Sequence, residues 1–425
     1  MATTHFNPRR AAAMPQSRNI VAALLARVAG WRYVGERRDL RFDLLRGLAV
    51  IAMVTDHVGG DKSWLYALTG GNHFWTSAAE GFVFISGLVM GIVYPAVVAR
   101  QGLGAALLKV LKRAGTLYAL TVLLTLTTAA LAYRLQVHWA PQVTAGTLAE
   151  FVIGVLTLHR AYYLTDVLLM YTLLVFAAAG AIFLINEKRT RLVLAISWAT
   201  WGIWQFFPQQ AALPWAITDN SVFNLAAWQL LFFNGLVIGY HRKALAERFG
   251  WATGRIALLV SGTLFAGSVA LYRDGLAPLI KLTGRDAAWF ETYIFSKSDE
   301  RIGRVLAFAI FASFALSLVT NLWQPILKAF GWLLLPLGQS ALLAYGLHLF
   351  VIMFTTKIGP TLLGEGDFTA SQNALLQSLG ILIIWTIVVV RPRALQLLQG
   401  LRPTWSVTPR VQHQRVAVRV PQRRS

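Results

Sequence analysis

The chain has 425 residues and a formal net charge of +21; hydrophobic residues make up 56% of it and charged residues only 13%. This composition excludes an ordinary soluble protein and predicts an all-α polytopic membrane protein. The absence of cysteine excludes disulfides, thiolate nucleophiles and cysteine-based metal sites, and we expect no metal site.

The positive charge is concentrated at the two ends of the chain. Residues 1–41 carry eight arginines, and eight more follow from Arg391 onward with no acidic residue. Basic segments beside apolar spans are typical of the cytoplasmic side of a membrane and do not require a nucleic-acid partner. We therefore predict that both termini are cytoplasmic. The expected parts are a basic N-terminal tail over 1–40, a membrane domain over 41–392 and a basic, disordered tail over 393–425.

Residues 1–35 also faintly resemble an organelle transit peptide, because they are rich in alanine and arginine and contain no acid. A cytoplasmic tail with a short interfacial helix is the favoured interpretation, since Arg27 interrupts any apolar core of a signal sequence.

Ten apolar segments are predicted to span the membrane as one helical bundle. The loops support this orientation: basic residues gather in the predicted cytoplasmic connections, whereas the predicted outer loop 273–300 has four basic and five acidic residues. The apolar run 147–159 is too short to span and is predicted to form a re-entrant or interfacial helix on the outer surface. The predicted spans are 42–60, 74–97, 114–133, 163–185, 191–207, 223–240, 256–272, 301–321, 331–353 and 373–390.

The first predicted span carries ionisable residues where they are costly. His57 follows Arg46 by eleven positions, so the two share nearly one helical face and lie about 16 Å apart along it. Asp43 falls on the same stripe, one turn before Arg46. Ionisable side chains within a span usually face the bundle interior and mark a pathway or a reaction centre.

Several further residues are predicted to share the outer depth of His57. A histidine beside a carboxylate can take a proton from a hydroxyl group, and His57 with Glu80 is the preferred pair. Asp56 neighbours His57 in sequence but points about 100° away from it on a helix. The other residues expected in this outer layer are Asp166, Tyr345 and His348, with Arg301 and Arg304 at its rim.

The inner layer is expected to be cationic. Arg41, Arg46 and Arg113, together with Lys109 and Lys112, suit phosphates or another polyanion, although the positive-inside bias also produces such clusters. Ser86 and Gly87 provide small residues in the second span, whose ordinary role is close helix packing.

Each residue also has an ordinary explanation. Arg46 could reach back to the interface, and His57 or His348 could be structural. The convergence of several groups at one depth favours a functional site.

Three motifs resemble a known family. Arg46-x₁₀-His57, preceded by Asp43, resembles the first span of the membrane acyltransferase superfamily that includes the type-three acyltransferases. Glu80-Gly-Phe-Val-Phe-Ile-Ser86-Gly87 is similar to its second-span motif, and the segment from Ser340 to His348 is similar to its late-span pattern. With Tyr163-x-x-Asp166-Val-Leu-x-Met-Tyr171, the set most resembles the OpgC branch, which holds osmoregulated periplasmic glucan succinyltransferases.

This resemblance implies a bacterial inner-membrane O-acyltransferase. It implies an acyl-CoA donor, such as succinyl-CoA, on the cytoplasmic side, a periplasmic carbohydrate acceptor and no tightly bound cofactor. His57 is expected to be the catalytic base, assisted by Glu80 or Asp56, and Arg41, Arg46 and Arg113 are expected to bind acyl-CoA. Substrate or acyl positioning is assigned to Asp43, Ser86, Asp166, Arg301, Arg304, Tyr345 and His348.

The sequence leaves several alternatives open. A free succinyl carboxylate would need a cation, for which Arg301 or Arg304 is available, and Tyr345 or His348 could donate to the reacting carbonyl oxygen. Transfer could be direct or pass through an acyl-enzyme on His57. A transporter or flippase for a glycan or polyanion is the second functional hypothesis, although no internal repeat supports it, and a structural membrane subunit is the third.

Overall fold

The computed structural model of the protein describes residues 30–400, except 36–37, 60–61, 70, 72, 138–139, 141–142, 221 and 365–367. Within these residues the regular elements are helices, and an isolated β-bridge joins Arg160 to Thr218. The all-α prediction is therefore confirmed. Residues 1–29 of the segment expected to hold an interfacial helix, and residues 401–425 of the tail expected to be disordered over 393–425, lie outside the described residues. Residues 393–400 belong to the helix Ala370–Gly400.

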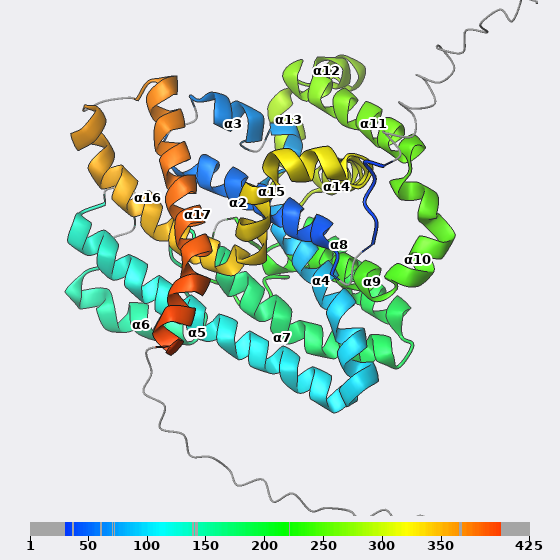
Figure 1. Ribbon diagram of the computed structural model, residues 1–425, viewed down its shortest axis with the longest axis horizontal. Coiled ribbons are helices and arrows are strands. Elements are labelled where there is room, and N and C mark those ends of the chain that lie inside the picture. The colour runs from blue at the N-terminus through cyan, green and yellow to red at the C-terminus, as the bar shows by residue number, and fades with distance from the viewer. Residues whose placement is uncertain are drawn as a thin grey trace, which may run out of the picture. The chain divides into compact units, whose positions relative to one another are not determined.

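Figure 1 shows the helices in chain order. The longer ones are α2 (Leu40–His57), α4 (Ala78–Gln101), α5 (Leu103–Leu135), α7 (Asp166–Asn186), α8 (Thr190–Phe206), α9 (Leu225–Tyr240), α11 (Arg255–Arg273), α14 (Ile302–Asn321), α15 (Trp323–Gln339), α16 (Ala341–Leu363) and α17 (Ala370–Gly400). Shorter helices are α3 (Trp64–Thr69), α6 (Leu148–Leu156), α10 (Arg242–Phe249), α12 (Ala277–Thr283) and α13 (Ala287–Tyr293). The chain divides into a unit that ends at Val388 and a short unit that begins at Val389; all packing discussed below lies in the first.

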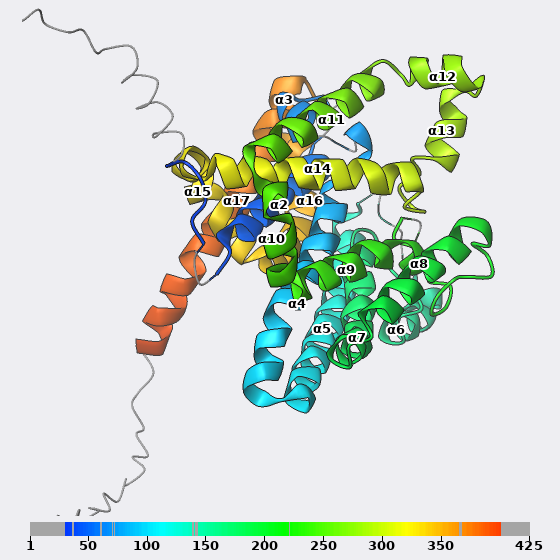
Figure 2. The same ribbon diagram turned by 90° about the vertical axis from the view of Figure 1, so that its right-hand side faces the viewer.

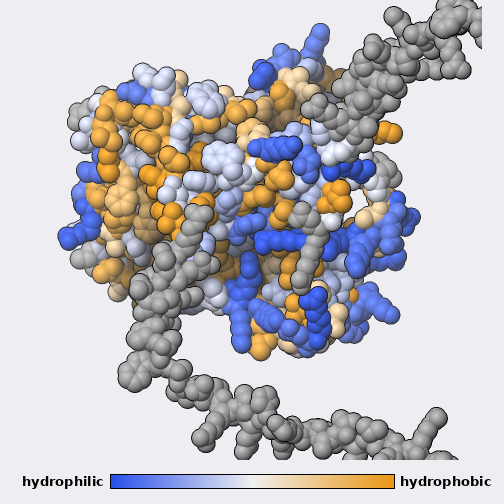
Figure 3. Space-filling view, in the orientation of Figure 1, coloured by the Kyte–Doolittle hydropathy of each residue, from blue (hydrophilic) through white to orange (hydrophobic). Residues whose placement is uncertain are grey.

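Seven helices among the described residues are long and apolar enough to cross a membrane, namely α4, α5, α7, α11, α14, α16 and α17. Apolar side chains also cover much of the face shown in Figure 3, including the region over α16. Large apolar residues such as Phe176 on α7 and Leu259 on α11 are more than 60% exposed. Extended apolar surfaces of this kind are unfavourable in water and suit a lipid environment. The chain is a multi-pass membrane protein.

Nine of the ten predicted spans each contain one long helix. The span predicted over 331–353 is wrong, because α15 ends at Gln339 and α16 begins at Ala341. Ser340 separates them with φ −114° and ψ 29°, outside the helical conformation. The short run 147–159 does form a short helix, α6, as expected.

Glycines allow α4 and α9 to lie in backbone contact (Figures 1 and 2). Gly87 and Gly91 on α4 face Gly235 and Gly239 on α9, and a β-carbon at any of the four would collide with the backbone of the opposite helix. Two small residues spaced by four positions are a common basis for close packing of membrane helices. The ordinary role expected for Gly87 is therefore confirmed.

The charged first helix lies against α15 in the same manner. Gly47 on α2 meets the backbone of Leu334, and Gly338 on α15 meets the backbone of Asp43. Farther along α2, Val54 packs in a core cluster with Ile384 of α17. Elsewhere α5 lies along α7, while α11 and α14 run side by side with α12 and α13 at one end (Figure 2). These contacts leave one face of α2 directed toward α4, α7 and α16.

Candidate active site

A polar cavity of about 500 Å³ lies between α2, α4, α5, α7 and α16. It combines apolar walls with ionisable side chains contributed by helices that are distant in sequence. Pockets of this size with a few converging polar groups are typical of small-molecule sites. Its ionisable and phenolic lining residues are Arg46, Asp56, His57, Arg113, Tyr163, Asp166, Tyr171, Asp219, Lys297, Tyr345 and His348.

The cavity follows α2 along much of its length. Arg46 and His57 both line it, which corresponds to about 16 Å along the helix. Arg113 and Tyr171 lie within electrostatic reach of Arg46 at one end. His348 and Lys297 lie within reach of His57 at the other. Arg46 and His57, which were predicted to share one helical face, therefore lie toward opposite ends of one cavity.

The two histidines form a close pair. The ring centroids of His57 and His348 are 5.6 Å apart. Nδ1 of His348 donates a hydrogen bond to the backbone carbonyl of Tyr345, three residues earlier on α16. Because a carbonyl can only accept, this bond assigns the proton of a neutral ring to Nδ1 and leaves a lone pair on Nε2. That Nε2 and the Nδ1 of His57 are both buried without a hydrogen-bond partner. Both rings are therefore available for proton transfer.

Carboxylates border the same end of the cavity. Asp56 lines the cavity, and its buried Oδ1 has no hydrogen-bond partner. Asp166 begins α7 and accepts a hydrogen bond of 2.9 Å from the backbone nitrogen of Val167, where the helix dipole favours negative charge.

The expected bond between Glu80 and His57 is absent. Glu80 is fully buried, its Oε1 accepts from Nε of Arg304 at 2.6 Å, and its Oε2 accepts from Ser77. The carboxylate therefore caps the start of α4 and pairs with α14, and it does not line the cavity. The assignment of Glu80 as the residue that orients His57 is not supported by this geometry.

Four further predicted residues also lie outside the cavity lining. Each is held by protein groups instead of facing the cavity. Arg41 contacts Asp39 at 2.7 Å and Thr320 at 2.8 Å. Asp43 is buried against Arg38 at 2.8 Å and lies 3.7 Å from Arg46. Arg301 donates to the carbonyl of Gln205 at 2.9 Å, and Arg304 pairs with Glu80.

The remaining eight predicted residues line the cavity, although not all with free functional groups. Arg46, Asp56, His57, Ser86, Arg113, Asp166, Tyr345 and His348 are among its walls. The hydroxyl of Tyr345 donates to the carbonyl of Leu164 and is therefore already engaged.

Sequence reasoning missed Lys297, Tyr171 and Asp219 as cavity residues. The hydroxyl of Tyr171 is buried beside Ser86, whereas Asp219 pairs with Arg160 at 2.9 Å. Tyr171 stands in a quoted motif, five residues after Asp166, which gave a weak signal. Lys297 lies in an irregular loop, where no periodic pattern shows the direction of a side chain.

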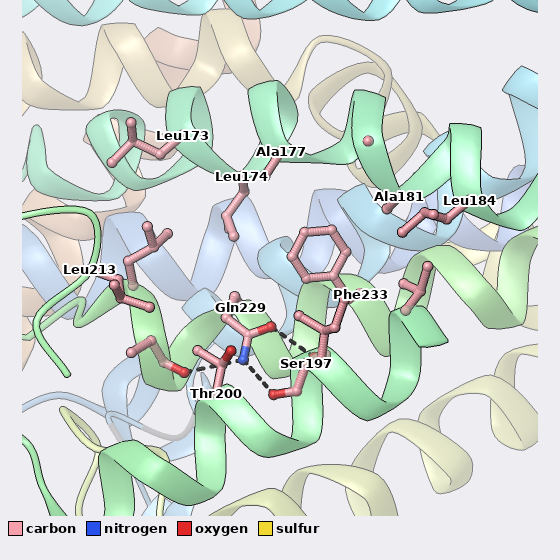
Figure 4. Close-up of a pocket in the computed structure, with 15 residues that line it drawn as sticks. Leu173, Leu174, Ala177, Ala181, Leu184, Ser197, Thr200, Leu213, Gln229 and Phe233 are labelled. Carbon is pink, nitrogen blue, oxygen red and sulfur yellow. Dashed lines mark hydrogen bonds between the residues drawn. The ribbon is translucent and has the colours of Figure 1, made fainter. Parts of the chain in front are cut away.

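A second cavity of about 320 Å³ lies between α7, α8 and α9 and is shown in Figure 4. Its walls are mostly apolar, and no ionisable side chain lines it. Its main polar feature is a hydrogen bond of 2.7 Å from Ser197 to Gln229, which satisfies both groups. Acid–base chemistry therefore belongs to the polar cavity.

The fold and this site define a class: a multi-pass helical membrane protein whose buried cavity joins cations at one end to paired histidines at the other. Residues 38–395 match the family described as OpgC protein, and the chain belongs to that family. Membership indicates a membrane acyltransferase similar to the glucan succinyltransferases. No curated protein and no solved structure shows a significant match to the chain.

Proposed function

We propose that the protein is an inner-membrane O-acyltransferase that transfers a succinyl group from cytoplasmic acyl-CoA to hydroxyl groups of a periplasmic glucan or related glycan. The observation that carries this proposal is the single cavity along α2, with Arg46 and Arg113 toward one end and His57 and His348 at the other. A donor with a polyanionic head and a long arm fits such a site, because its phosphates and its reacting thioester must lie far apart.

In this mechanism His57 takes the proton of a sugar hydroxyl as the oxygen attacks the thioester carbonyl carbon. The carbon–sulfur bond then breaks, the ester forms, and the thiolate of coenzyme A receives the proton from His57. His348 supports this transfer through the lone pair on Nε2, and Asp56 offers a negative charge near the imidazolium. The hydroxyl of Tyr345 is already bonded to Leu164, so it is not free to donate to the carbonyl oxygen.

The donor's phosphates are assigned to Arg46 and Arg113. Arg46 keeps its side chain 18% exposed while lying beside Asp43, so a guanidinium remains accessible at this end of the cavity. Arg41 is less suitable, because Asp39 and Thr320 occupy its guanidinium. Direct transfer and an acyl-enzyme on His57 are both compatible with this arrangement.

A topology of ten spans with cytoplasmic termini accounts for the helices. In this topology the seven long apolar helices all cross the membrane, and α2, α8 and α9 are three further, shorter spans. Both ends of α15 contact the segment around the start of α2: Gln324 bonds to the carbonyl of Trp31, and Gly338 meets Asp43. A helix whose two ends lie at one level does not cross the bilayer, so α15 preserves the even number of crossings.

The test is transfer by the purified protein in nanodiscs, with succinyl-CoA as donor and a periplasmic glucan as acceptor. We expect succinyl esters on the glucan and stoichiometric release of coenzyme A, both dependent on His57. A transporter would move glycan without releasing coenzyme A. The absence of ester formation with every acyl-CoA tested would refute the proposal.

A further inference from the structure

Lys297 is a partly buried cation that faces the polar cavity. It lies in the loop between α13 and α14 and lines the cavity with His57 and Asp56. Within the described part of the chain its ammonium group makes no hydrogen bond and no ion pair within 4 Å. A partly buried ammonium group that lines a cavity without a direct partner is a candidate for binding an anionic ligand.

The loop that carries Lys297 is fixed by bonds to α8 and to the start of α9. Trp201 donates to the carbonyl of Glu300 at 2.9 Å, and Gln205 donates to the carbonyl of Asp299 at 2.9 Å. Asn224 donates to the carbonyl of Ser298 at 3.1 Å. Bonds to three successive backbone carbonyls hold the loop beside the cavity, so Lys297 is positioned before any ligand binds.

Glu80 and Asp56 attract Lys297 electrostatically, but neither forms a direct ion pair with it. Arg304 is directly bonded to Glu80, and these two charges balance each other. Glu300 lies 3.8 Å from Arg304, and burial, reinforced by Glu80, raises its pKa well above the usual value, so Glu300 favours its neutral form. The field of Lys297 instead reaches Asp56, His57 and Asp166 in the cavity.

We propose, on the basis of the proposed function, that Lys297 binds the free carboxylate of a dicarboxylic acyl group while the thioester lies beside His57. Two methylene groups separate the carboxylate from the thioester carbonyl in a succinyl group, so both must be accommodated at the same end of the cavity. Lys297 meets this requirement, whereas Arg301 and Arg304, the cations expected from sequence, do not line the cavity. A single ammonium would therefore select an acidic acyl group over a neutral one.

The test compares succinyl-CoA with butyryl-CoA, in which a methyl group replaces the carboxylate. Transfer and equilibrium binding of both donors are measured for wild type, Lys297→Gln and Lys297→Arg in nanodiscs. The control is Lys281→Gln, which removes an exposed lysine on α12.

We expect Lys297→Gln to lower the preference for succinyl-CoA over butyryl-CoA at least ~10-fold, since a charge-assisted hydrogen bond is lost. Lys297→Arg should retain most of the preference, and Lys281→Gln all of it. Equal losses with both donors would show that Lys297 only supports Asp56 or the loop, and would overturn the inference, as would an unchanged preference.

The same experiment distinguishes failure of the proposed function from failure of the inference about Lys297. A wild-type protein that transfers neither acyl group would refute acyl transfer, while the binding preference would still decide whether Lys297 recognises the carboxylate.

Discussion

The imidazole rings of His57 on α2 and His348 on α16 lie 5.6 Å apart, centroid to centroid, at one end of the polar cavity. The bond from His348 Nδ1 to the carbonyl of Tyr345 fixes the tautomer of the neutral ring, so its buried Nε2 carries a lone pair without a hydrogen-bond partner. Two neutral imidazoles in contact can pass a proton that neither could retain alone in an apolar setting. We therefore assign the proposed acid–base chemistry to this pair instead of to a histidine–carboxylate bond.

The first prediction concerns His57. His57→Ala should lower the rate of glycan acylation at least ~100-fold, the lower range for loss of general acid–base catalysis. Its melting temperature in detergent should stay close to that of wild type, because Nδ1 of His57 makes no hydrogen bond to lose. Acylation at the wild-type rate would remove His57 from the mechanism.

The second prediction concerns the ion pair of Glu80 and Arg304. Glu80→Gln leaves the buried guanidinium without its partner charge and should destabilise the protein by ~3 kcal/mol or more. The double variant Glu80→Gln with Arg304→Gln should recover part of this loss, since Glu300 already favours its neutral form. Thermal unfolding in detergent measures both effects. A Glu80→Gln variant that is fully stable but inactive would return Glu80 to a direct catalytic role.

The third prediction tests the orientation of the helices. The chain has no cysteine, so a single introduced cysteine can be labelled without background. Lys281→Cys on α12 and Lys109→Cys on α5 both replace exposed residues. A membrane-impermeant maleimide should label position 281 in intact spheroplasts and position 109 only after permeabilisation. The reverse pattern would invert the topology and move acyl-CoA to the other end of the cavity.

The fourth prediction is a pH dependence of donor choice. Burial lowers the pKa of Lys297 below the usual lysine value, although Glu80 partly opposes this. The cation is present below that pKa and lost above it, so preference for succinyl-CoA over butyryl-CoA should fall as pH rises through the lowered pKa, at a pH below the ordinary lysine value of about 10.4. Lys297→Arg should keep its preference over this range, because a guanidinium stays charged. A wild-type ratio that does not change with pH would contradict the prediction.

The fifth prediction concerns the contact between α4 and α9. A methyl group at Gly87 would collide with the backbone at Phe232, so Gly87→Ala should destabilise the protein by ~1–3 kcal/mol through overpacking. Gly115→Ala is the matched control, since a β-carbon at Gly115 on α5 meets nothing within 4 Å. Equal melting temperatures for the two variants would show that α4 and α9 are not in backbone contact.

The sequence by itself determined the helical class, the positions of nine long helices and the face shared by Arg46 and His57. These features depend on residues close together in the chain, because apolar length sets a span and the helical period sets a face. The branch resemblance likewise came from motifs within single helices, and the family match confirms it.

Only the tertiary structure decided which side chains meet. Glu80 lies within electrostatic reach of Asp56, but its carboxylate bonds to Arg304 on α14 instead of to His57. α15 ends at Gln339 because Ser340 leaves the helical conformation, and the apolar residues on both sides of the Gln339–Ser340 pair concealed this break from hydropathy. Lys297 reaches the cavity because bonds from α8 and α9 fold its loop inward. Depth along a helix can be counted from sequence, whereas the rotation of each helix and the path of each loop are set by packing between distant segments.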